Sequence, residues 1–264
     1  MKGVILAGGL GSRLAPLTSA TNKHLLPVFD SPMIFYPIYT LTDAQISEIM
    51  IVVSGPHAGD FISILKNGES FHDVKKLVYA YQDRPNGGIA DALSLAKEFS
   101  EGQPLVVILG DNTTDANISN SIINFEQVIK ANDIPQAQIF LKKVENAKDF
   151  GVPVFGKNGK LIKIEEKPKK PKSNFAVTGL YLYDKHVFDF IDNCTPSSRG
   201  ELEITDVNNF YINNGLMHWE ELNGFWQDAG SFENLYKANE YWYNKNIARE
   251  AALKQPKVKA RKLK

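Results

Sequence analysis

The sequence predicts an α/β fold, a three-layer, Rossmann-like and mostly parallel sheet with helices on both faces. Two observations carry this prediction. Short apolar runs rich in β-branched residues recur along the chain, and amphipathic stretches with helical spacing lie between them. Strand and helix alternate in this way through the first half, which is typical of a parallel sheet with crossover helices.

The predicted strands of the first half are short and bounded by turn residues, so each is expected to be buried on both faces. They are Val4–Ala7, Ile49–Val53, Leu105–Leu109 and Ile139–Val144. The helices predicted between them are Met33–Gln45, Ile89–Phe99 and Ser119–Lys130.

The second half changes character. Lys160–Glu166 alternates apolar and polar residues and Val177–Tyr183 is a further strand, so a few antiparallel or edge strands are expected there. Glu201–Asn213 and Phe232–Lys245 are predicted as closing helices. We expect one domain over residues 1–248 and a basic, flexible tail over 249–264, which carries seven basic residues and one acidic. A weak anion-binding or partner-docking arm is the alternative interpretation of this tail.

Composition excludes several functional classes. Thirty basic residues balance thirty acidic ones, so no overall field favours nucleic acid or an anionic membrane, and a polyanionic ligand must be held by local features. No apolar run approaches the roughly 18 residues of a membrane span. The single cysteine, Cys194, excludes an internal disulfide and is interpreted as a packing residue, which suits a cytoplasmic protein.

The strongest local signal is the glycine-rich loop that follows the first strand, Gly8–Leu14. Glycines at 8, 9 and 11 let several backbone N–H groups point at one anion, and Arg13 adds a permanently charged guanidinium. The spacing matches neither the dinucleotide-binding fingerprint nor the P-loop. Taken alone, the loop could be only a tight turn.

A second signal follows at Lys23, which begins the segment Lys23–Val28. A lone lysine before an apolar run is usually a surface residue, but a triphosphate needs more than one counter-charge. With Pro16–Thr18 and Pro32–Ile34, these segments resemble the glucose-1-phosphate thymidylyltransferases, in their short form, which lacks the extra C-terminal helices of the long form. This resemblance implies the fold and the activity of the sugar nucleotidyltransferase family.

Further segments match the same family in order along nearly the whole chain. They are Gln82, Gly87–Ala92, Leu109–Asn112, Phe150–Val152, Glu165–Pro168, Ala176–Tyr181, Pro196–Asp206 and Trp226–Gly230. The chain departs from the usual pattern at Thr113–Asp115, at Pro153 and at Ser12 in place of threonine. The first two departures adjoin the expected sugar pocket, so the sugar preference stays open.

The resemblance implies a role for each matched residue. Arg13, Lys23 and Lys167 would be the catalytic cations, with Lys167 holding the sugar phosphate. Asp111 and Asp228 would share a Mg²⁺ ion, although each could instead be a turn residue. The implied nucleotide-binding set is Gly8, Gly9, Gly11, Ser12, Arg13, Lys23, Gln82 and Gly87.

The remaining implied contacts concern the base and the sugar. The amide of Gln82 can donate and accept, which suits a thymine or uracil edge, although a strand-end surface residue is the plainer interpretation. The sugar-phosphate set is Asn112, Gly151, Glu166, Lys167 and Val177. Glu166 would accept a sugar hydroxyl or would simply neighbour Lys167.

The expected reaction joins dTTP to glucose 1-phosphate and releases pyrophosphate, with dTTP or UTP and a sugar 1-phosphate as the bound partners. No nucleic acid or membrane partner is expected, and homo-oligomer formation is left open. One alternative is a uridylyl- or cytidylyltransferase acting on another sugar 1-phosphate. The other is a non-catalytic regulatory subunit, which should have lost the charged residues Arg13, Lys23, Asp111, Lys167 and Asp228, yet all are present.

Overall fold

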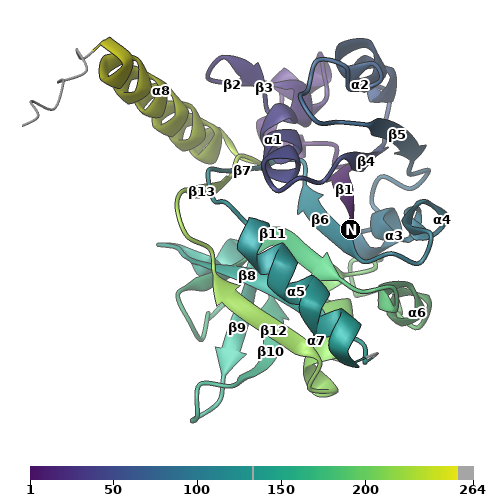
Figure 1. Ribbon diagram of the computed structural model, residues 1–264. Coiled ribbons are helices and arrows are strands. Elements are labelled where there is room, and N and C mark those ends of the chain that lie inside the picture. The colour runs from purple at the N-terminus through teal and green to yellow at the C-terminus, as the bar shows by residue number, and fades with distance from the viewer. Residues whose placement is uncertain (133, 255–264) are drawn as a thin grey trace, which may run out of the picture.

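A seven-stranded sheet forms the centre of the molecule (Figure 1). The computed structural model describes residues 1–132 and 134–254. The strands, in spatial order, are β12 (Met217–Glu221), β8 (Ala137–Lys143), β11 (Phe175–Tyr183), β6 (Leu105–Leu109), β1 (Lys2–Ala7), β4 (Glu48–Val53) and β5 (Lys76–Tyr81). All run parallel except β11, which pairs antiparallel with both β6 and β8. The mostly parallel sheet predicted from the sequence is confirmed.

The antiparallel strand lies at the centre of the sheet. β11 is buried along nearly its whole length, because it is covered on both faces and flanked on both sides. The strands at the edges are β5 and β12, neither of which the sequence patterns had indicated. Both strands are only partly buried and mix polar with apolar residues, so neither contains the apolar run rich in β-branched residues by which the strands of the first half were predicted.

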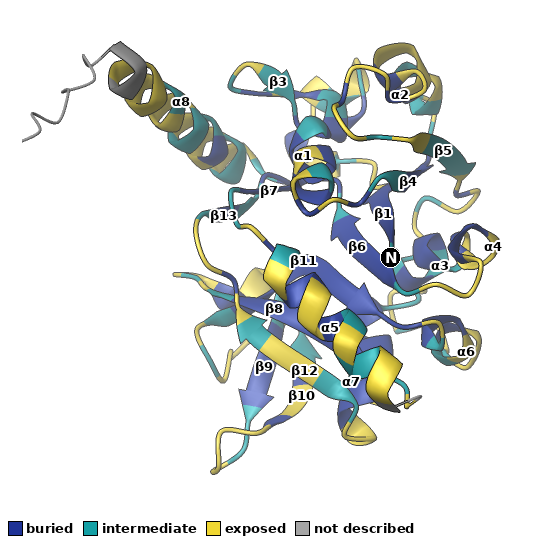
Figure 2. Cartoon of the chain, in the orientation of Figure 1, coloured by how far each residue is buried: buried dark blue, intermediate teal, exposed yellow. Residues whose placement is uncertain are grey.

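Helices cover both faces of the sheet, and the strand pleat separates the two cores. Val4 and Leu6 of β1 face one core, which contains α3 (Ile89–Ser94), α4 (Lys97–Ser100), α6 (Val187–Asp192) and α7 (Ile204–Asn213). Ile5 and Ala7 face the other, which contains α1 (Phe35–Asp43), α2 (Ala58–Leu65) and α5 (Ser119–Asn132). Figure 2 shows the central strands buried and the outer sides of the helices exposed. The single helix expected over Ile89–Phe99 is in fact two helices, α3 and α4.

The described residues also form three small two-stranded sheets and four 3-10 turns. The small sheets are β9 (Gly151–Phe155) with β10 (Leu161–Glu166), β7 (Asn112–Thr114) with β13 (Trp226–Asp228), and β2 (Pro27–Val28) with β3 (Ser31–Pro32). The turns are η1 (Ser12–Leu14), η2 (Leu17–Ser19), η3 (Lys23–Leu25) and η4 (Ala147–Asp149). The β7–β13 pair matters most for function, because it joins two segments more than a hundred residues apart.

The last described element is helix α8 (Phe232–Lys254), which projects from the body (Figure 1). Ala238 is buried in a small cluster with Val28 and Tyr36, so the first part of the helix packs on the body. The helix continues past the expected end at Lys245 and across the expected boundary at residue 248. The rest of the predicted tail, 255–264, lies outside the described residues. Among the helices of the described chain, none has the length and apolar character needed to cross a bilayer.

Candidate active site

A cleft of about 1230 Å³, including its open mouth, lies over the carboxyl ends of the parallel strands. Gly8 and Gly9 follow β1, Gln82 follows β5 and Asp111 follows β6, and all four residues line the cleft. Open α/β sheets bind their ligands at this edge. Residues of β10 and α7 form the opposite wall.

Most of the residues predicted from the sequence meet in this cleft. Those that line it are Gly8, Gly9, Arg13, Lys23, Gln82, Asp111, Asn112, Gly151, Glu166, Lys167, Val177 and Asp228. Gly11, Ser12 and Gly87 are not in the lining. Gly11 has a φ of 69° and lies against Lys23, where a Cβ atom would come within 2.7 Å of the lysine Cβ. Gly11 therefore lets the loop close over Lys23.

The short β7–β13 ladder brings the two predicted metal-binding carboxylates together. Asp111 immediately precedes β7, Asp228 ends β13, and the N–H of Ala229 donates to the Asp111 carbonyl at 2.9 Å. A Cβ atom placed on Gly230 would lie 2.7 Å from Asp228 Oδ1, 2.9 Å from Arg13 Nη2 and 3.4 Å from Asp111 Oδ2. These three charged groups therefore surround one glycine, and any side chain there would collide with them.

Charge in this cluster is distributed unevenly. Lys23 Nζ donates to Asp111 Oδ2. Burial is the largest single influence on Asp111 and would raise its pKa, but the charge of Lys23 and the hydrogen bonds from Lys23 and Asn112 act together against it and hold this pKa below its ordinary value. Burial, followed by repulsion from Asp111, raises the pKa of Asp228 to about 6. Burial and the nearby Lys23 charge lower the pKa of His24 to about 3, so this ring is neutral at neutral pH.

The donor set of this cluster suits a magnesium ion. Two carboxylates supply hard oxygen ligands, and Mg²⁺ usually takes its other positions from water and substrate phosphates. The raised pKa of Asp228 also fits, because a bound cation would stabilise the ionised form that repulsion now disfavours. Within the described residues there is no group of three or more His, Cys, Asp or Glu side chains placed to hold a metal. Asp111 and Asp228 would therefore hold such an ion together with the substrate.

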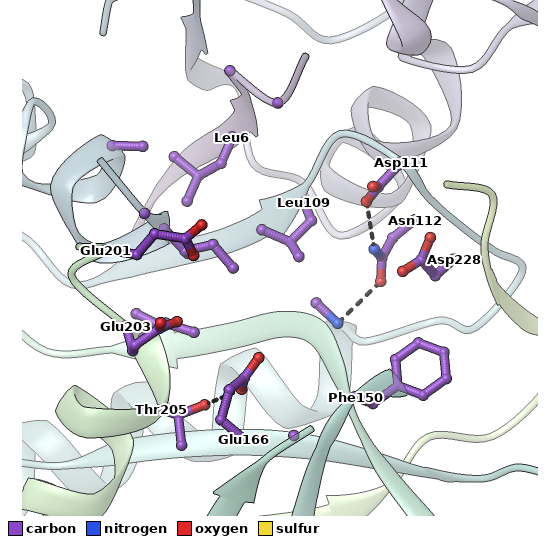
Figure 3. A pocket seen from close by; sticks show the side chains of 18 of the residues that line it. Leu6, Leu109, Asp111, Asn112, Phe150, Glu166, Glu201, Glu203, Thr205 and Asp228 are labelled. Carbon is purple, nitrogen blue, oxygen red and sulfur yellow. Dashed lines mark hydrogen bonds between the residues drawn. The ribbon is translucent and has the colours of Figure 1, made fainter. Parts of the chain in front are cut away.

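Asn112 lines the cleft, but its amide is committed to the protein. Its oxygen accepts from the Gly179 N–H at 3.0 Å and from the Trp226 indole at 2.6 Å. Its NH₂ group donates to Asp111 Oδ1 at 3.1 Å (Figure 3). Both amide ends therefore orient Asp111 and fasten β7 to its neighbours. Asn112 still lines the cleft, and its role at the sugar phosphate stays a prediction.

At the other end of the cleft, Lys167 and Glu166 lie beside Arg199. Lys167 has a φ of 41°, an uncommon conformation for a residue other than glycine, and its N–H donates to the Phe150 carbonyl at 3.0 Å. Glu166 Oε1 lies 3.7 Å from Lys167 Nζ and 3.5 Å from Arg199 Nη2. Its Oε2 accepts from the Thr205 hydroxyl at 2.6 Å (Figure 3). Two cations therefore converge where a sugar phosphate is expected.

Several lining residues were not assigned a role from the sequence. They include His24, Tyr181, Arg199, Glu201, Glu203, Thr205, Asn208 and Trp226. The block Pro196–Asp206 was recognised as family-like, so its Arg199 offered a signal: a cation among acidic neighbours. Glu203 pairs with Arg199 at 2.8 Å, which holds the guanidinium at the cleft.

Comparison with known proteins decides the family. The nucleotidyl transferase family model matches residues 2–245. The chain belongs to the nucleotidyl transferase family. It is 40% identical over 242 residues to a glucose-1-phosphate thymidylyltransferase of Neisseria meningitidis serogroup A, covering 90% of this chain and 81% of the relative. It is 38% identical over 244 residues to that of Mycolicibacterium smegmatis, covering 91% and 82%. The resemblance noted in the sequence is confirmed.

Comparison with solved structures agrees with this assignment. A crystal structure from Bacillus anthracis, assigned as a glucose-1-phosphate thymidylyltransferase in complex with a sucrose, superimposes with a TM-score of 0.83 at 46% identity. The match covers 91% of this chain and 94% of that one. A UDP-glucose pyrophosphorylase, with a TM-score of 0.74 and 19% identity, shares the fold.

The electrostatic strain at Asp228 predicts that Asp228→Asn stabilises the metal-free protein. The pKa is raised from 3.8 to about 6, so ionisation costs stability. That cost is absent below about pH 4, grows as the pH rises and is complete above about pH 6. A shift of about two units sets an upper bound of about 3 kcal/mol. Thermal unfolding in EDTA should show a clearly larger gain at about pH 7.5 than at about pH 5. Equal gains at both pH values would contradict this.

Proposed function

We propose that this nucleotidyl transferase transfers the thymidylyl group of dTTP to glucose 1-phosphate, forming dTDP-glucose and pyrophosphate. The observation that carries the proposal is the arrangement of one cleft. A glycine loop with Arg13 and Lys23 lies at one side, Lys167 and Arg199 lie at the other, and Asp111 with Asp228 lies between. Relatives 38–40% identical to this chain carry the name of that activity.

The chemistry needs alignment more than proton transfer. The sugar 1-phosphate oxygen is already anionic, so it can attack the α-phosphorus of the nucleotide without a strong general base. The O–P bond to the sugar phosphate forms as the bond to pyrophosphate breaks, and the electron pair leaves with the pyrophosphate. What opposes the reaction is repulsion between two anions, which fixed cations can neutralise.

The nucleotide half of the cleft is built by the first strand and its loop. Gly8 and Gly9 let the phosphates approach the backbone, and a Cβ on Gly9 would lie 3.4 Å from Lys23 Nζ. Lys23 and Arg13 supply positive charge to the triphosphate and to the departing pyrophosphate. Lys23 now pairs with Asp111, and binding of the nucleotide would offer it phosphate oxygens as alternative partners.

The sugar half is built by β9, β10 and α7. Lys167 and Arg199 would hold the sugar phosphate from two directions, because both approach Glu166 at the cleft wall. Glu166 keeps the two cations close together and presents its carboxylate to the sugar hydroxyls. Gly151 and Val177 complete the wall. Capture of both substrates in fixed orientation converts a bimolecular encounter into an aligned displacement.

The proposed metal site lies where the nucleotide half and the sugar half of the cleft meet. Asp111 and Asp228 would hold Mg²⁺, which would offset the negative charge of the reacting phosphates. The chain's own contribution is to hold both carboxylates in place, through the β7–β13 ladder and through the amide of Asn112. The single cysteine, Cys194, suits the reducing cytoplasm expected for this reaction.

A pyrophosphate-release assay tests the activity directly. With glucose 1-phosphate and Mg²⁺, turnover should be fastest with dTTP, measurable with UTP and poor with CTP, ATP and GTP. Omission of either the sugar phosphate or the metal should abolish release. Preference for ATP, GTP or CTP would overturn the thymidylyl assignment, and preference for another sugar 1-phosphate would overturn the glucose assignment.

The two lysines should separate kinetically. Lys167→Gln should raise the KM for glucose 1-phosphate, whereas Lys23→Gln should chiefly lower kcat/KM for dTTP. Glutamine keeps a donor but removes the charge, and a hydrogen bond to a charged group contributes about 1.5–3 kcal/mol, or about ten- to a hundredfold in rate. Steady-state kinetics with each substrate varied in turn gives both constants. A Lys167→Gln enzyme altered only in its KM for dTTP would reverse the roles.

Asp111 and Asp228 should act as one unit. Asp111→Asn and Asp228→Asn keep the side-chain shape, and each should lower turnover by several orders of magnitude. The double variant should be little worse than the worse single variant, because groups that share a ligand are non-additive. Calorimetric titration with Mn²⁺ in the presence of nucleotide should show the same loss of metal binding. Fully additive losses, or an active Asp228→Asn enzyme, would show that the two carboxylates hold no common metal.

A further inference from the structure

Behind the cleft, the carboxylate of Asp91 holds the side-chain amide of Gln82. We propose that Asp91 is a positioning residue that selects the base, because it fixes which end of the Gln82 amide faces the nucleotide. The inference rests on the proposed function, since it takes Gln82 to be the base-reading residue. Asp91 is not part of the cleft lining. From the sequence it lay within the segment Gly87–Ala92, which resembles the family's base-reading segment, but it was not itself assigned as a site residue.

The two ends of the Gln82 amide point in opposite directions. Gln82 follows β5 and is only 4% exposed. Its Nε2 donates to Asp91 Oδ2 at 2.7 Å and to the Gly88 carbonyl at 3.2 Å. Its Oε1 faces the glycine loop, where a Cβ on Gly8 would approach it to 2.6 Å. Both N–H bonds of the amide are therefore used within the protein, and only the oxygen is directed to the nucleotide loop.

This orientation cannot reverse without loss. A carboxylate and a backbone carbonyl are acceptors only, so a rotated amide would set its oxygen against two other oxygens. A buried acceptor facing acceptors loses its hydrogen bonds and gains repulsion. The backbone is fixed as well, because the Gln82 N–H donates to the Val53 carbonyl at 2.8 Å and the Ser54 hydroxyl donates to the Gln82 carbonyl at 2.8 Å.

Asp91 is itself held in place. It lies in the first turn of α3, and its other oxygen, Oδ1, pairs with Arg84. Its side chain is 14% exposed. Gly87 passes directly over the same carboxylate, so a Cβ there would collide with Asp91 Oδ2. Gly87 is thus required to make room for Asp91, which explains its place in the motif although it does not line the cleft.

An amide oxygen alone demands a donor from the base. Thymine and uracil both carry N3–H at the middle of their pairing edge, and this proton would bond to Gln82 Oε1. Cytosine carries a lone pair at N3, which would face the Gln82 oxygen without a proton between them. A site built to hydrogen-bond one group rejects the analogue that lacks it, so cytosine would be disfavoured in the pose that sets N3 against this oxygen, because its own donor, the N4 amino group, takes the place of O4. The 5-methyl group and the 2′-hydroxyl, which separate dTTP from UTP, are not read by this contact.

The test compares UTP with CTP, which share the ribose and differ only in the N3 and C4 groups of the base. Glucose 1-phosphate is supplied with an equimolar mixture, and the two nucleotide-sugar products are quantified by mass spectrometry. Their ratio equals the ratio of kcat/KM values, whatever fraction of the enzyme is folded. Asp91→Asn replaces the charged acceptor by a group that can accept or donate, so only the longer bond to the Gly88 carbonyl still favours one orientation of the Gln82 amide. The preference for UTP over CTP should fall by about tenfold or more.

Two matched variants and one internal ratio serve as controls. Arg84→Gln removes the partner of Asp91 but leaves its carboxylate, and Asp91→Glu keeps an acceptor, so both should retain more of the UTP preference than Asp91→Asn. The dTTP-to-UTP ratio should not change in Asp91→Asn. A uniform loss of activity in Asp91→Asn with an unchanged UTP-to-CTP ratio would overturn the proposal and leave Asp91 a structural residue. A wild-type enzyme that prefers CTP or a purine nucleotide would instead overturn the proposed function.

Discussion

The side chains of Asp111 and Asp228 create the constraint on which the site depends, because two like charges lie close together and largely out of water. Such a pair is unfavourable unless cations and fixed geometry compensate it. Lys23 pairs with Asp111, and Arg13 lies on the same side of Gly230. The β7–β13 ladder prevents the pair from relaxing apart. The fold thus keeps a cluster of charges that a divalent cation and a polyphosphate would complete.

The central position of β11 serves the same cluster. Gly179 in this strand would bring a Cβ within 2.6 Å of Leu109 and 2.8 Å of the Asn112 amide nitrogen, so only glycine lets β11 lie this close to β6. The Gly179 N–H, freed by the register shift between Val177 and Tyr181, donates to Asn112. Asn112 then donates to Asp111. The irregular stretch of β11 is therefore linked through one amide to the predicted metal ligand.

Much of the fold could be predicted from the sequence, since apolar runs such as Leu105–Leu109 are long enough and buried enough to be distinctive. The edge strands could not. Met217–Glu221 carries exposed polar residues because one side of it has no neighbour, and Lys76–Tyr81 is buried only in part. The antiparallel direction of Phe175–Tyr183 also leaves no mark in composition, because a strand covered on both faces is apolar in either direction. Whether Phe175–Tyr183 runs parallel or antiparallel to its neighbours depends on the path of the chain between the strands, which composition does not reveal.

The charged site residues were found in another way: the resemblance to a family assigned Arg13, Lys23, Asp111, Lys167 and Asp228 from motifs spread along the chain. The sequence does not show which side chains hydrogen-bond to these residues. The amide of Gln82 could be read from the sequence as donor and acceptor together, yet contact with Asp91, nine residues later, removes the donor half. Asn112 likewise turns inward to Trp226. In both cases the polar residue at the cleft was the easier one to find. The partner that orients the amide, Asp91 for Gln82 and Trp226 for Asn112, lies behind it in the fold. Folding alone brings the two side chains of each pair together, so the sequence does not show the contact.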